Sequence, residues 1–257
     1  LFRSLLQNGW QDARDRDKDN VARDPFGKSV SGDGKFAYYG VNEAFVLVVP
    51  CLGESRIDAK FEHYVGVVYD KIQKESEVYT YRLIVCVDAD IDDTQSEMNP
   101  TKNRDAVSLL VGKAEAYILR KKGEAEPKKI LPVYPDANGN WSLFDSRCSV
   151  QVVRWQTDTP LAQGIPTKQT LERLVCSAIC EAYPERLQEV ALWLTDKSEN
   201  PKAYAWSHMA GWYADHGCDD FYKEIWREEK VRPLLERKLN EIGAWEVFAS
   251  LSHPNLT

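Results

Sequence analysis

The spacing of apolar residues predicts a strand, a helix and a second strand in the first third of the chain. Continuous apolar runs at residues 44–49 and 83–87, the second within a predicted strand at 81–87, are typical of buried strands. Between them, residues 57–74 carry apolar side chains at the three- and four-residue spacing of one helix face. This order predicts a βαβ unit with a right-handed crossover. The second strand is apolar at successive positions, which predicts a central place in a parallel sheet.

The remaining pattern changes from short strands to helices. Strands are expected at residues 130–134, 141–144 and 149–155, with an Asn-Gly hairpin signal between the first two. The mixed-charge stretch at residues 11–34 is expected to be an exposed loop. The expected helices, besides 57–74, cover residues 1–10, 105–121, 170–183, 187–194, 201–215 and 221–243.

Composition places the chain among ordinary globular proteins. It has 257 residues, of which 43% are hydrophobic and 28% charged, enough for one large domain or two small ones. We expect an α/β core at residues 1–160 and a helical region at residues 161–257 that completes or covers it. The net charge of −7 excludes a uniformly basic nucleic-acid-binding module, but a local basic groove stays open.

The expected cellular compartment follows from three features that the sequence does not show. No apolar run reaches membrane-spanning length, and no signal peptide is visible. The six cysteines have no zinc-ribbon spacing. We therefore expect a cytoplasmic protein with reduced thiols and no membrane association.

Four acidic residues follow directly on the strand at residues 81–87. Residues 88–93 read Asp-Ala-Asp-Ile-Asp-Asp, at the carboxyl end of the strand, where open α/β sheets bind their ligands. Crowded carboxylates repel one another unless a cation neutralises them, and oxygen ligands suit Mg²⁺ or Mn²⁺. Asp88 and Asp90 are the candidate ligands, whereas Asp92 and Asp93 are better explained as surface acids. An ordinary acidic loop is the alternative for the whole cluster.

Three kinds of protein share an Asp-x-Asp motif after an apolar strand. Haloacid-dehalogenase-like phosphatases do so, with Asp88 as nucleophile and Asp90 as acid–base, but Asp92 departs from their Thr or Val. Nucleotide-sugar transferases share only the short motif. The order of elements resembles the Toprim fold best: a strand with the small-residue turn Cys-Leu-Gly at 51–53, a helix, and a strand ending in Asp-x-Asp.

The Toprim resemblance implies a mostly parallel central sheet flanked by helices, followed here by a helical C-terminal part. The first Toprim strand and its Glu are expected upstream of Leu1, because residues 1–6 look like the middle of a helix. Thr-Leu-Glu-Arg-Leu at 170–174 resembles the helix-borne Leu-Glu element of OLD-like and small Toprim nucleases, so Glu172 would complete a second metal site. Asn-Pro-Lys at 200–202 resembles their Lys element, which would make Lys202 a catalytic cation.

The resemblance implies two-metal hydrolysis of DNA or RNA, with Mg²⁺ or Mn²⁺ ions roughly 3.5–4 Å apart. It also implies a role as an effector in anti-phage defence, beside a separate ATPase subunit or as a homo-oligomer. Glu172 has the alternative of a first-turn acid favoured by the helix dipole, and Lys202 that of a surface cation. A non-enzymatic interaction protein on a degenerate Toprim scaffold is the competing function.

The histidines and tryptophans are weaker candidates for a functional site than the acidic cluster. His208 lies among apolar and aromatic residues, so a packed helix histidine is the better interpretation. The eight tryptophans include several in the helical part, where they could stack bases but at helical spacing are more often core or interface anchors.

Overall fold

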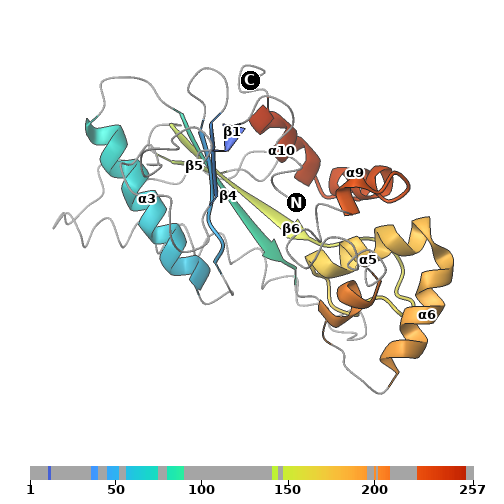
Figure 1. Ribbon diagram of the computed structural model, residues 1–257. Helices are drawn as coiled ribbons and strands as arrows, with labels where there is room; N and C mark the ends of the chain where they lie inside the picture. The colour runs from blue at the N-terminus through green and yellow to red at the C-terminus, as the bar shows by residue number, and fades with distance from the viewer. Residues whose placement is uncertain are drawn as a thin grey trace.

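The computed structural model describes ten stretches of the chain (Figure 1). These are residues 11–12, 36–39, 45–51, 56–74, 80–89, 141–143, 147–195, 200, 202–208 and 225–252. The elements in chain order are β1 (Gln11–Asp12), β2 (Phe36–Tyr39), β3 (Phe45–Val48), α3 (Ile57–Lys74), β4 (Tyr81–Asp88), β5 (Trp141–Leu143), β6 (Cys148–Trp155), α5 (Leu171–Ala182), α6 (Pro184–Leu194), α9 (Arg232–Glu241) and α10 (Ala244–Ser252).

The described strands form two three-stranded sheets. In one, β1, β2 and β3 pair in antiparallel order. In the other, β6 lies between β4, to which it is parallel, and β5, to which it is antiparallel. The α/β class is therefore confirmed, with a small parallel element at β4 and β6.

One expectation about β4 was wrong, and another is not met among the described strands. The predicted βαβ unit required β3 and β4 in one sheet, but β3 is hydrogen-bonded to β2, in a sheet separate from that of β4. The predicted central strand is at the edge of its sheet among the described strands, and β6 is central. An apolar run reports burial of both strand faces and not the number of neighbouring strands, so it does not fix a place in the sheet.

Burial of both faces of β4 explains its apolar sequence. Leu83 and Val85 pack with the apolar side of α3 (Phe61, Val65). Their neighbours Ile84 and Cys86 pack on the opposite face, against a core built largely from the C-terminal helices. Successive strand residues point to opposite faces, so each layer takes every second side chain. Figure 1 shows the same arrangement, with α3 on one side of the strands and α9 and α10 on the other.

The C-terminal helices largely follow the predicted pattern, with one correction. The helix expected over residues 221–243 is interrupted: residues 225–227 are helical, residues 229–231 form a turn, and α9 begins at Arg232. Pro233 explains the new start, because proline suits the first turn of a helix and breaks its interior. Gly243, at φ +69°, then separates α9 from α10, a helix that the sequence did not predict.

Several predicted elements lie outside the described residues. These are the helices at 1–10 and 105–121, the strand at 130–134 and most of the loop at 11–34, of which Gln11–Asp12 is strand β1. Strand β2 is an addition that the apolar pattern missed. Within the described part of the chain, none of the helices combines the length and the apolar character needed to cross a bilayer.

Candidate functional site

Asp88, the residue singled out by the acidic cluster, ends strand β4 with an exposed side chain. Its Oδ1 accepts a hydrogen bond of 2.9 Å from the backbone N–H of Leu171, which is 83 positions later in the chain. The next residue is held in place, because the N–H of buried Ala89 donates to the carbonyl of Trp155 at the end of β6. The carboxylate thus lies where the end of the parallel pair meets the start of α5.

The start of α5 explains why Asp88 is bound there. Thr170 is the N-cap: its backbone is extended, and its Oγ1 accepts from the N–H of Arg173 at 3.3 Å. The N–H of Leu171, the first helical residue, has no acceptor within the helix, and Asp88 supplies one. The positive end of the helix dipole also favours a carboxylate at this position.

Glu172 follows Leu171 directly and lies in the first turn of α5. The hydrogen bond to Asp88 therefore brings the two predicted acids to adjoining segments, although 84 positions separate them in sequence. Asp90 lies outside the described residues. Among the residues that are described, no group of three or more His, Cys, Asp or Glu side chains is close enough to hold a metal ion.

A buried polar network fixes the segment that leads into α5. The side-chain amide of Gln169 makes two hydrogen bonds with the backbone of Thr157, one to its N–H (2.9 Å) and one to its carbonyl (3.0 Å). Arg173, which is 1% exposed, donates to the carbonyls of Thr167 (2.7 Å) and Thr159 (3.1 Å). Buried hydrogen bonds of this kind restrict the backbone segments that they join. The position of Glu172 relative to the sheet is therefore set by residues 157–173.

Lys238 joins this network from α9, a contact that the sequence did not indicate. Its buried ammonium donates to Thr159 Oγ1 at 2.7 Å and lies 3.5 Å from Glu181 Oε2. The hydrogen bond from Arg237 to Glu181 is the main reason that the pKa of this carboxyl is lowered, and Lys238 adds to the effect. In sequence, Lys238 is one of many charges in a helix, and no signal distinguishes it from exposed neighbours.

Lys202 begins the described helix at residues 202–208 with an exposed side chain. Asn200 caps this helix, because its Oδ1 accepts from the N–H of Lys202 at 3.0 Å. Figure 1 shows β4 and β6 running toward the side of the molecule where α5 and α6 lie. A joint action of Lys202 with Asp88 and Glu172 stays a prediction.

His208, by contrast, is a buried structural residue, as the sequence pattern indicated. Its Nε2 lies 2.6 Å from the carbonyl oxygen of Gly164, to which the neutral ring donates, and 3.6 Å from the sulfur of Cys180. Burial lowers the pKa of His208, so the ring stays neutral. Burial also raises the pKa of Cys180 to about 12, so this pair contains a thiol and not a thiolate nucleophile. The five described cysteines are free thiols.

The lowered pKa of His208 predicts a loss of stability in acid. The unfolded histidine, with a pKa of about 6.5, takes up a proton that the folded ring resists, so the free energy of unfolding falls as the pH drops below about 6.5. We expect the decrease in the free energy of unfolding between pH 7.5 and 5.5 to be smaller in the His208→Gln protein. Urea unfolding of both proteins at the two pH values measures this. An equal decrease in both would contradict the assignment.

No protein-family model, curated protein or solved structure matches the chain. The Toprim resemblance therefore rests on the residues and on the order of elements alone.

Proposed function

We propose that this chain is a Mg²⁺- or Mn²⁺-dependent Toprim-like nuclease that hydrolyses phosphodiester bonds of DNA or RNA. The observation that supports it is the hydrogen bond from the first amide of α5 to Asp88. This bond joins the end of the strand that carries the Asp-x-Asp motif to the helix turn that carries Glu172. In a Toprim-like nuclease, residues from these two elements share the metal site.

The chemistry of the described residues fits a hard divalent cation. Asp88 and Glu172 supply carboxylate oxygens, which Mg²⁺ prefers, and the Asp88 side chain is exposed to solvent. Each carboxylate has about four acceptor positions, so the bond from Leu171 is compatible with metal binding at the same group. Asp90 would be the third ligand. Bound ions of this kind activate water and stabilise the leaving oxygen of a phosphodiester.

Other residues of the chain would orient the metal ligands and neutralise negative charge on the phosphate. The Leu171 amide holds Asp88 in one orientation, which is the support that a precise metal ligand needs. The buried network beneath α5 does the same for the turn that bears Glu172. Lys202, an exposed cation in the segment that resembles the nuclease Lys element, would offset charge that develops on the phosphate.

The proposal predicts that Glu172→Gln lowers metal-dependent cleavage about tenfold or more, because it removes a charged ligand without changing side-chain size. Cleavage of end-labelled single-stranded and duplex DNA and RNA, with Mg²⁺ or Mn²⁺ and with EDTA, measures it. Glu185→Gln is the matched control: Glu185 is an exposed acid in the first turn of the neighbouring helix α6, and its loss should leave cleavage unchanged.

Two results would overturn the proposal. Cleavage by the unaltered protein that persists in EDTA would exclude a metal-dependent reaction. Equal cleavage by the Glu172→Gln protein and the unaltered protein would remove Glu172 from the site.

Turnover of a phosphomonoester, with a phosphate trapped on Asp88, would instead identify a phosphatase. A requirement for a separate ATPase chain would appear as cleavage only when that chain is added.

A further inference from the structure

The described tryptophans divide into a buried and an exposed group. Trp155 and Trp226 are 5% and 8% exposed, and Trp226 stacks on Trp245 with 5.9 Å between ring centroids. Trp193 and Trp206 are different, with 63% and 57% of their surface exposed. The first group are core anchors, as helical spacing suggested. Large aromatic side chains exposed to this extent are unusual and point to a binding surface.

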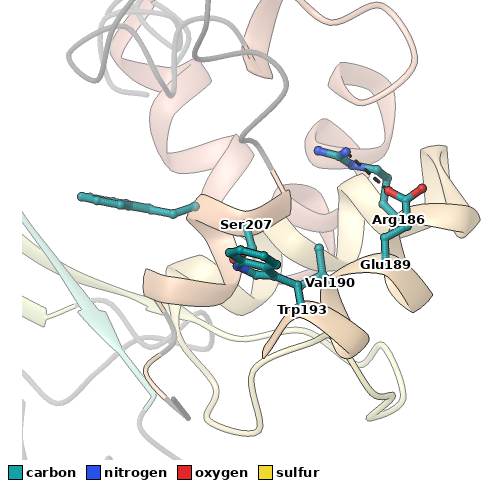
Figure 2. Close-up of a pocket in the computed structure, with 6 residues that line it drawn as sticks. Arg186, Glu189, Val190, Trp193 and Ser207 are labelled. Atoms are coloured by element: carbon teal, nitrogen blue, oxygen red, sulfur yellow. Dashed lines mark ion pairs between the residues drawn. The ribbon is translucent and has the colours of Figure 1, made fainter. Parts of the chain in front are cut away.

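Both exposed tryptophans line one groove, of about 390 Å³ (Figure 2). Its walls are two helices: α6 contributes Arg186, Glu189, Val190 and Trp193, and the helix at residues 202–208 contributes Trp206 and Ser207. Figure 2 shows the Trp193 indole turned toward Ser207, with Arg186 and Glu189 farther along α6.

The two walls are fixed relative to each other and to α5. Arg186 of α6 donates a hydrogen bond to the carbonyl of His208, at the end of the second wall. The His208 ring contacts Cys180 of α5 and the carbonyl of Gly164. Both indoles are therefore carried by preformed helices, so binding requires little ordering of the backbone that carries them. The same helical group carries Glu172, at the other end of α5.

An exposed cation beside the groove favours an anionic ligand. Arg186 and Glu189, three positions apart on α6, form an ion pair at 3.6 Å and neutralise each other in part. Lys202 then adds a positive charge: it lies four positions before Trp206 on one helix, which places the two on the same face. Ser207 adds a hydroxyl donor. The lining itself carries one cation and one acid, and the exposed Lys202, one helical turn before Trp206, supplies the positive charge for a phosphate beside the groove.

We propose that this groove binds single-stranded nucleic acid, with bases stacked on Trp193 and Trp206 and a phosphate near Lys202. The inference rests on the proposed nuclease function and names its substrate class. Every base has an aromatic face, so indoles bind single strands with little sequence preference. A base pair within a duplex is already stacked on its neighbours and cannot offer that face. Hence single strands are the preferred ligand.

The test is a fluorescence titration of the full chain in EDTA with an oligothymidylate of about 15 nucleotides, so that binding is measured without cleavage. We expect tryptophan quenching, and binding at least about tenfold tighter than that of a duplex of equal length. The double variant Trp193→Leu, Trp206→Leu keeps apolar volume but loses the aromatic faces. It should bind the oligonucleotide about 25-fold more weakly, or about fivefold for each indole.

Two controls separate stacking from a general apolar contact. The double variant Trp193→Phe, Trp206→Phe keeps an aromatic face at each position and should bind within about threefold of the unaltered protein. Leu161→Ala removes another exposed apolar side chain, outside the groove, and should have no effect.

Three outcomes would overturn the inference. They are equal binding by the Trp→Leu variant, equal binding of duplex and single strand, and self-association of the chain that the Trp→Leu variant abolishes while oligonucleotide binding persists. The last would make this surface an interface between copies of the chain. The nuclease proposal fails by a different measurement, namely if Glu172→Gln leaves cleavage unchanged. The titration without metal measures binding alone, so its result does not depend on that outcome.

Discussion

Asp88→Asn is expected to lower Mg²⁺-dependent cleavage by at least about 100-fold, because even groups that only support a metal ligand cost 10- to 100-fold when they are removed. The substitution suits this position. An asparagine Oδ1 can still accept the hydrogen bond from Leu171, so the link between β4 and α5 is kept while the negative charge is lost. Cleavage assays and calorimetric titration with Mg²⁺ measure the effect.

Asp88→Ala separates the chemical role of this residue from its structural one. Alanine removes the acceptor as well as the charge, so the free energy of unfolding should also fall, by about 1 kcal/mol for an exposed, charge-assisted hydrogen bond. Asp88→Asn should unfold close to the unaltered protein. If Asp88→Asn cleaves as fast as the unaltered protein, Asp88 is a helix-capping residue and the proposed metal site is wrong.

Gly164→Ala is expected to lower the free energy of unfolding by about 2–5 kcal/mol. Gly164 has φ +87°, where a side chain is strained, and an added Cβ would lie 2.4 Å from the backbone oxygen of Leu187 in α6. A backbone oxygen within a helix cannot rotate away as a flexible side chain would. The same residue accepts the hydrogen bond from His208, so displacement would also disturb that contact. Urea unfolding measures the loss.

Gly243→Ala is the matched control for this prediction. Gly243 also has a positive φ, of +69°, but an added Cβ there meets no atom within 4 Å. It should cost only the backbone strain, about 1–2 kcal/mol. A loss at Gly164 no larger than at Gly243 would show that α6 moves aside readily. That outcome would also weaken the view of the groove walls as fixed.

Local patterns predicted much of the secondary structure. The helix at residues 57–74 and the strand at 81–87 agree with α3 and β4 to within one residue, because each has a continuous periodicity and a defined buried side. Thr170 at the predicted start of a helix is its N-cap, with the hydrogen bond that this residue type favours. The break near Pro233 was missed, since the apolar spacing continues across it.

The candidate site was predicted only in its parts. Asp88 was identified by a cluster of acids at a strand end, a signal local to the sequence. Glu172 was identified by resemblance, and nothing in its own segment indicated that the start of its helix would lie beside Asp88. The exposed tryptophans could not be separated from the buried ones, because both groups occur at helical spacing.

The sequence by itself determined the positions of the main helices and strands and the acidic end of β4, because periodicity and capping depend on residues close together in the chain. Only the tertiary structure decided which strands pair, that Leu171 binds Asp88, and that Trp193 and Trp206 face a groove while Trp226 is buried. These features depend on contacts between segments distant in sequence. Which side chain is covered is set by the packing of whole elements, and no local pattern encodes it.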